Sequence, residues 1–143
     1  METEKFFSLV VFNYLFSNGD AHLKNFALLE TVSGDHFLSP AYDLLNTRMH
    51  VSDTDFALNK GLFADDFRSP LFKRTHHPAK EDFMVFAERT GIEAKRAQKL
   101  LAPFLETPEK LNTLIDRSFL DESTKKSFQL NYNTRKNFLS REQ

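Results

Sequence analysis

A dense apolar run lies near the beginning of the chain, between Phe6 and Phe16. Its apolar positions cover nearly the whole circumference of a helix, and a helix of that kind is buried on most of its sides. Thr3 is a candidate N-cap residue for it. The run from Ser17 to Gly19 ends the helix, because Asn and Gly tolerate left-handed backbone angles. The pattern therefore predicts a buried helix from Thr3 to Phe16, followed by a polar loop.

Two short apolar segments follow this loop, and both are typical of β-strands. They span residues 26–29 and 35–38, and the connection from Thr31 to Gly34 has the length of a hairpin loop. Residues 39–78 show no clear period, although residues 50–58 alternate weakly as a strand would. We therefore predict a small β-hairpin followed by an irregular segment.

The second half of the chain has apolar residues at helical spacing, among them Phe83, Phe86, Tyr132 and Leu139, which we expect in the core. Gly91 and the Thr107-Pro108 pair are typical helix boundaries. No internal repeat or sustained heptad pattern argues for a solenoid or a coiled coil. The sequence thus predicts a mainly α-helical bundle with a small β-hairpin, whose later helices span residues 79–90, 92–105, 108–119 and 122–140.

The composition is that of one folded globular domain covering residues 1–143. The chain is 41% hydrophobic and 27% charged, with a net charge of −1. A nearly neutral chain has no overall field that attracts nucleic acid or acidic membranes, so direct nucleic-acid binding is not expected. The apolar run near the beginning is too short to span a bilayer. The lack of cysteine excludes disulfides and thiol nucleophiles, and we expect a cytoplasmic protein.

The residues that could carry chemistry are concentrated in the predicted loop, which reads Asn-Gly-Asp-Ala-His-Leu-Lys-Asn from position 18. In protein kinases a catalytic-loop Asp accepts the proton of the substrate hydroxyl, and an Asn five positions later binds Mg²⁺. Asp20 and Asn25 have this separation. Asp43 offers a second oxygen ligand, because a hairpin between Asn25 and Asp43 returns the chain to the same edge.

His22 and Lys24 lie between the candidate base and the candidate metal ligand. An imidazole there could brace the loop, and an ammonium group could neutralise a phosphate during its transfer. Both could equally be solvated loop residues. Because Asp and Asn are common in loops, the hypothesis depends on the whole succession of buried helix, loop, hairpin and Asp43.

Residues 18–25, followed by Pro-Ala-Tyr-Asp-Leu-Leu at residues 40–45, resemble the signature of the HipA-like C-terminal domain. This domain is the catalytic lobe of the HipA toxin kinases. The resemblance implies that Asp20 is the catalytic base and that Asn25 and Asp43 bind Mg²⁺ and, through it, ATP. Asp43 would correspond to the Asp of the kinase Asp-Phe-Gly motif, although its neighbours here differ from that motif.

The resemblance also implies a protein-kinase-like C-lobe and phosphorylation of serine or threonine hydroxyls. No Gly-rich phosphate-binding segment precedes the loop in this sequence, so we expect the N-lobe to be absent and the isolated chain to be inactive. Mg²⁺ and ATP are expected to bind only when an N-lobe completes the cleft. The partners implied are a separate N-lobe chain, an intact HipA-like kinase, or a helix-turn-helix (HipB-like) antitoxin.

Two other functions remain open. The chain could be a non-catalytic binding or regulatory module of a toxin–antitoxin system. It could also be a small-molecule or lipid phosphotransferase lobe, because those enzymes use a similar Gly-Asp-x-His-x-x-Asn loop. The Pro40 to Leu45 context favours the HipA-like alternative.

Other polar groups have ordinary interpretations. We expect His76 and His77 to be solvated loop residues, because adjacent histidines point apart and no carboxylate lies at ligand spacing. The basic turns of the late helices, including Arg135-Lys136, are expected on a charged surface. The following acidic residues do not follow a calcium-loop pattern and are assigned to surface loops: Asp53, Asp55, Asp65 and Asp66.

Overall fold

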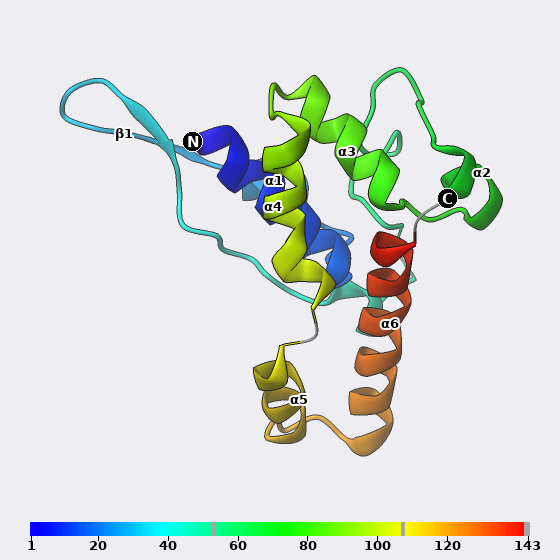
Figure 1. Ribbon diagram of the computed structural model, residues 1–143. Coiled ribbons are helices and arrows are strands. Elements are labelled where there is room, and N and C mark those ends of the chain that lie inside the picture. Colours follow the sequence, from blue (N-terminus) through cyan, green and yellow to red (C-terminus); the bar gives the residue numbers. More distant parts are fainter. Residues whose placement is uncertain (53, 107, 142–143) are drawn as a thin grey trace.

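The structure is a computed structural model that describes residues 1–52, 54–106 and 108–141. It is mainly helical and carries a two-stranded antiparallel hairpin (Figure 1), as the sequence predicts. Asp53, predicted in a surface loop, lies outside the described residues. In chain order the elements are α1 (Glu2–Leu15), η1 (Leu23–Asn25), β1 (Leu28–Glu30), β2 (His36–Leu38), η2 (Thr47–Met49), α2 (Pro70–Thr75), α3 (Lys80–Arg89), α4 (Ala94–Leu105), α5 (Glu109–Asp116) and α6 (Glu122–Ser140).

Helix α1 is the centre of the molecule. It contacts α4, α6 and β2, while α3 packs against α4 and α6. Figure 1 shows α4 crossing α1, with the upper part of α6 beside the end of α1 and the rest of α6 extending down beside α5. The apolar side chains between these helices form the core, as the helical spacing predicts: Phe7, Val10, Val11, Tyr14, Leu15, Phe83, Ala87, Ile92, Ala97, Leu101, Leu111, Ile115, Tyr132 and Leu139.

The N-terminal end of α1 begins earlier than predicted. The helix starts at Glu2 with Met1 as its N-cap, so Thr3 is inside the helix and is not its cap. Glu2 and Glu4 lie in the first turn, where carboxylates interact favourably with the helix dipole. These carboxylates also tie α1 to its neighbours, because Glu2 Oε2 accepts from Leu38 N at 2.6 Å and Glu4 pairs with Arg96.

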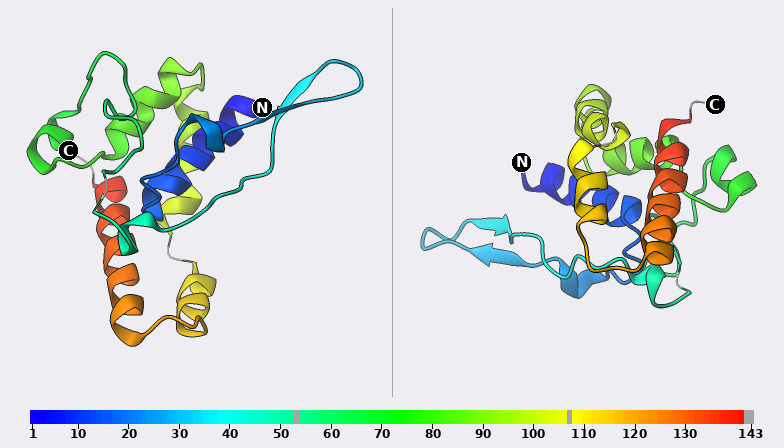
Figure 2. Two further views of the ribbon diagram at one scale, coloured as in Figure 1. Left: turned by 180° about the vertical axis from the view of Figure 1, so that it is seen from behind. Right: turned by 90° about the horizontal axis from the view of Figure 1, so that it is seen from below.

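The hairpin projects away from the helices, as the views of Figure 2 show from two sides. Its register pairs Leu28 with Leu38, Leu29 with Phe37 and Glu30 with His36. The first strand begins two residues later than the expected segment 26–29, because Phe26 turns back into the helical body.

Phe26 packs edge-on against Phe6 of α1, with ring centroids 5.0 Å apart. The hairpin turn depends on Gly34, whose φ of +85° is a left-handed angle that glycine adopts without strain.

The segment predicted to be irregular contains a short helix, α2. Ser69 caps it by accepting from Phe72 N, and Pro70 occupies the first helical position. The fully buried Asp82 carboxylate holds this cap, because it accepts hydrogen bonds from the Ser69 backbone and hydroxyl and from Ala79 N. The described part of residues 50–58 forms no strand.

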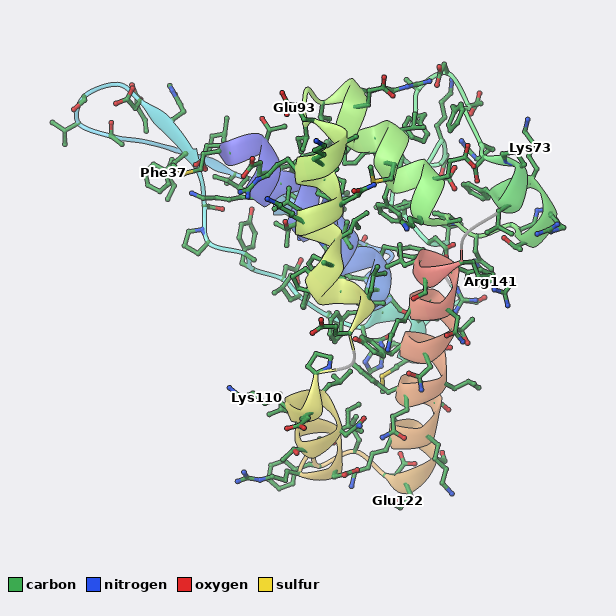
Figure 3. The ribbon with its side chains drawn as sticks, in the orientation of Figure 1. Phe37, Lys73, Glu93, Lys110, Glu122 and Arg141 are labelled. Atoms are coloured by element: carbon green, nitrogen blue, oxygen red, sulfur yellow. The ribbon has the colours of Figure 1, made fainter. Side chains whose placement is uncertain are left out.

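The remaining late helices lie close to their predicted ranges, although α5 ends at Asp116, earlier than expected. Glu122 and Arg141, labelled in Figure 3, mark the two ends of α6, which runs from beside α5 up to the level of α3. Within the described ranges, no helix has both the length and the apolar character that crossing a bilayer requires.

Candidate functional site

The candidate loop starts with a sharp bend at Ser17, which has a φ of +59°. We expected Asn18 or Gly19 to adopt the left-handed angle, but the bend falls on the serine. Thr47 fixes it, since the Thr47 N–H donates to Ser17 O at 3.1 Å and the hydroxyl of Thr47 accepts from Gly19 N at 2.9 Å. A left-handed non-glycine residue costs free energy and persists only where neighbouring contacts impose it. The loop therefore leaves α1 in a defined direction.

Asn18 connects the end of α1 with the segment that follows the hairpin. Its amide nitrogen lies 3.0 Å from Asn13 Oδ1 and 3.0 Å from the backbone oxygen of Asp43. Asn13 and Asn18 are both buried, so the hydrogen bond between them is shielded from water, whereas the one to Asp43 is partly buried. Asn18 thus holds the Asp43 backbone against the loop.

Asn25 and Asp43 are in direct contact, as the hairpin argument predicts. Asn25 Nδ2 donates to Asp43 Oδ2 at 2.5 Å, although hairpin residues separate them in sequence. Asp43 has a φ of +54°, a left-handed angle that Asp tolerates better than most residues. The neighbouring Tyr42 hydroxyl donates to Lys24 O at 2.5 Å, so both ends of the hairpin are tied together.

The donor set of this pair fits a magnesium ion. Asn25 is buried, and its Oδ1 atom has no hydrogen-bond partner among the described residues. A buried amide oxygen without a partner is costly, and a hard cation would satisfy it. Asp43, whose side chain is exposed, supplies a carboxylate beside it. Mg²⁺ is commonly held by one or two such oxygens together with substrate phosphates, rather than by a cage of protein ligands.

Asp20 lies on the exposed side of the same loop. Two backbone hydrogen bonds join it to Asn25: His22 N donates to Asp20 O at 2.7 Å, and Asn25 N donates to His22 O at 2.9 Å. His22 is half-buried, whereas Lys24 is exposed. The structure therefore places Asp20 and His22 on a turn that leads into η1 and Lys24 and Asn25 within η1, and it brings the Asn25 side chain into contact with Asp43.

Arg135 of α6 reaches the start of this loop from the far end of the sequence. Its Nε donates to Ser17 Oγ at 2.8 Å, and its guanidinium lies 5.0 Å from the centre of the Tyr14 ring. Nη1 of Arg135 lies 2.7 Å from Asp55 Oδ1, which is an ion pair rather than an aligned hydrogen bond. Burial raises the pKa of the Tyr14 phenol, which stays neutral and donates to Pro78 O.

This network corrects three expectations. Arg135 is buried rather than on a charged surface, and the Asp55 side chain is only 10% exposed rather than in a solvated loop. His77 is not a free loop histidine, because its Nδ1 lies 2.7 Å from Asp55 Oδ2, whereas the adjacent His76 is exposed as predicted. No sequence signal links Arg135 to Ser17, since 118 positions separate them.

We compared the sequence with known protein families. The profile of the HipA-like C-terminal domain matches residues 1–111, which include α1, the loop, the hairpin and Asp43. Arg135 lies beyond the matched residues.

Two relatives share parts of the sequence. A protein named "Putative kinase Y4dM" from Sinorhizobium fredii is 41% identical over 56 residues, which cover 39% of this chain and 14% of the relative. A protein named "Putative kinase" from Haemophilus influenzae is 25% identical over 136 residues, covering 85% of this chain and 37% of the relative. The chain thus matches well under half the length of each. Because the family profile spans most of the sequence, the chain belongs to the HipA-like C-terminal domain family.

Proposed function

We propose that this chain carries the catalytic loop of a serine/threonine protein kinase, in a lobe of the protein-kinase type. The observation that supports this most directly is the contact between Asn25 and Asp43, which sets an unpartnered buried oxygen beside a carboxylate. Membership of the HipA-like family and two relatives named as kinases agree with this reaction class. The reaction is phosphoryl transfer from ATP to a protein hydroxyl.

In this proposal Asp20 is the base that accepts the proton of the substrate hydroxyl. The hydroxyl oxygen bonds to the γ-phosphorus while the bond to the bridging oxygen breaks, and the electron pair leaves with ADP. Asn25 and Asp43 would hold Mg²⁺, which would neutralise charge on the phosphate oxygens. His22 braces the turn through its backbone, and the exposed Lys24 would neutralise a phosphate during its transfer.

A second lobe would complete the nucleotide site above the hairpin. Leu28 and Leu29 of the hairpin are 63% and 43% exposed, and Leu44 and Leu45 beside Asp43 are 48% and 52% exposed. Exposed apolar side chains on the hairpin and beside Asp43 favour contact with another polypeptide. We propose that these residues pack against a nucleotide-binding lobe, on the same or on a separate chain, and that transfer requires it.

The metal site can be tested on this chain supplied with a separate nucleotide-binding lobe, with Mn²⁺ as a paramagnetic stand-in for Mg²⁺. In the presence of ATP, Mn²⁺ should broaden the backbone NMR signals of Asn25 and Asp43 before those of α5 and α6. Asp43→Asn, which keeps the side-chain shape but removes the charge, should weaken the apparent affinity about tenfold or more, because it removes the only carboxylate of the pair.

Two variants separate this reading from a general loss of negative charge. Asp35→Asn removes a carboxylate from the exposed hairpin turn and should leave the broadening unchanged. Asp20→Asn should also keep the metal bound, yet abolish transfer when a nucleotide-binding lobe is supplied, since the base is gone. Broadening that survives Asp43→Asn undiminished would contradict the metal site and favour a non-catalytic binding module.

A further inference from the structure

An apolar cavity lies directly beside the candidate catalytic loop. Asn18, Ala21 and Leu23 form one side of it, so its wall brackets Asp20 and His22 in sequence. A second group of lining residues comes from the stretch after η2: Phe56, Ala57, Leu58, Gly61 and Leu62. Its volume of about 110 Å³ is somewhat smaller than an engineered cavity of about 150 Å³ that binds benzene. The cavity therefore has room for one small apolar group.

The inner wall is built from aromatic rings that the core leaves partly uncovered. Phe6 is half-buried and lies 5.0 Å from Phe26 and 6.3 Å from Phe86, measured between ring centroids. All three rings line the cavity. Removing such surface from water is favourable, in proportion to the apolar area covered. An apolar guest would therefore be stabilised here by the wall itself.

The mouth of the cavity is apolar as well. Two lining leucines are exposed: Leu23, on the candidate loop, by 71%, and Leu58 by 49%. Exposed leucines that line the same cavity are typical of a surface that receives a partner.

The residue types of the lining limit the kind of group that the cavity can bind. The described lining contains no Lys, Arg, His, Asp or Glu, so it offers nothing to a phosphate or to a charged side chain. Its polar groups are the amides of Asn13 and Asn18, and Asn18 also holds the backbone of Asp43. Asn18 therefore both lines the cavity and contacts the Asp43 backbone, and Ala21 of the lining directly follows Asp20 in sequence.

We infer that this cavity selects the protein substrate by taking one apolar side chain, of leucine or methionine size, from the segment that bears the phosphorylated hydroxyl. The inference rests on the proposed function, since the cavity can contribute to substrate selection only if Asp20 accepts a proton from a substrate hydroxyl. A peptide bound with its serine at Asp20 has its neighbouring side chains within reach of the cavity mouth, because Ala21 follows Asp20 directly.

The test uses fluorescent peptides and the whole chain, without nucleotide or metal. Each peptide contains one serine in a Gly, Ala and Lys background, with a single leucine moved through every position on either side of the serine. At one position the leucine peptide should bind about tenfold or more tightly than its alanine counterpart, because filling an apolar pocket discriminates to this extent. Fluorescence anisotropy measures the difference.

Variants of the cavity should remove this preference. Ala57→Leu enlarges a lining side chain and should fill the cavity, and Leu58→Asp places a charge at an exposed lining position. Leu114→Asp makes the same charge change at an exposed leucine of α5 and should preserve the preference. Because Leu58 is exposed, its variant should fold, which the dispersion of NMR signals can confirm.

The outcomes separate this inference from the proposed function. Equal affinity for leucine and alanine peptides, no binding of any peptide, or equal effects of Leu58→Asp and Leu114→Asp would each overturn the cavity inference alone. A leucine preference without Mn²⁺ broadening at Asn25 and Asp43 would instead overturn the kinase proposal, and with it the role of the cavity in selecting a phosphorylation substrate.

Discussion

Asp43 combines a strained backbone with a side chain that the proposed chemistry needs. Its φ of +54° lies in the region where a Cβ atom is crowded by the backbone. Tertiary contacts impose this angle, since Asn18 holds its backbone oxygen and Asn25 contacts its carboxylate. Such strain is often found where a side chain must be aimed at a ligand. Substitutions at position 43 can therefore separate the free-energy cost of the left-handed backbone from the contribution of the carboxylate side chain.

The prediction compares Asp43→Gly with Asp43→Ala. Both remove the carboxylate and its contact with Asn25, but only glycine adopts a left-handed angle freely. Asp43→Gly should therefore be the more stable variant, by about 1 kcal/mol in the free energy of unfolding measured in urea. Gly34→Ala, at a φ of +85° in the hairpin turn, is the matched control and should also be destabilised. Equal stabilities of the two Asp43 variants would mean that the backbone is not strained there.

At the residue scale, the sequence allows a contact to be predicted where a short hairpin joins the two residues and their types indicate a shared role. The pairing of Asn25 with Asp43 follows from a hairpin between them, and the structure has that contact. The left-handed angle at Ser17 could not be predicted, because Thr47 and Arg135 impose it from elsewhere in the chain. Local propensity favoured Asn18 and Gly19, and tertiary hydrogen bonds override it.

Among the elements, α6 has the best-defined beginning. Asp121 caps it, since Oδ1 accepts from Ser123 N at 2.9 Å and from Thr124 N at 3.0 Å, and Oδ2 accepts from the Thr124 hydroxyl. The hydroxyl and then the N–H of Thr124 are the largest causes that lower the pKa of Asp121 from 3.8 to about 2. A carboxylate that is bound in this way favours the ionised form in the folded state.

The consequence is an acid-dependent contribution of this cap. Because the folded pKa is below the unfolded value, the stabilisation is fully present above about pH 4 and is lost as the pH falls toward 2. Asp121→Ala should lower the melting temperature at neutral pH, and the difference from the unsubstituted protein should shrink in that acid range. Asn at position 121 can still accept hydrogen bonds from the two N–H groups, but it does not titrate. The difference in melting temperature between Asp121→Asn and Asp121→Ala should therefore stay constant over this pH range.

The elements whose boundaries were missed are those set by distant contacts. The first strand begins at Leu28 because Phe26 is drawn into the core by Phe6. Helix α2 was not predicted, since its cap is held by Asp82 from α3 and its length is short for a periodic signal. The late helices have apolar residues at helical spacing along their length, and this local pattern predicted their boundaries to within a few residues.

At the scale of the whole molecule, α6 and the candidate loop form one unit. The family profile ends at residue 111, yet Arg135 beyond it contacts Ser17 and pairs with Asp55. Asp55 in turn lies beside His77, so three distant parts of the chain meet behind the loop. Sequence periodicity places α6 correctly but treats Arg135 as a surface residue, because nothing in the local sequence distinguishes it from the other basic residues of this helix.

We therefore predict that Arg135→Met destabilises the protein by about 3 kcal/mol, because Asp55 is left buried with a weaker set of cationic partners. Lys126→Met removes an exposed cation from the same helix and should change stability by less than about 0.5 kcal/mol. Urea unfolding measures both, and a double-mutant cycle of Arg135→Met with Asp55→Asn should show coupling on the order of 1 kcal/mol or more. If α6 positions the loop through Ser17, Arg135→Met should also shift the amide NMR signals from Ser17 to Asn25, whereas Lys126→Met should not. A loss of stability without those shifts would mean that α6 stabilises the core but does not position the candidate loop.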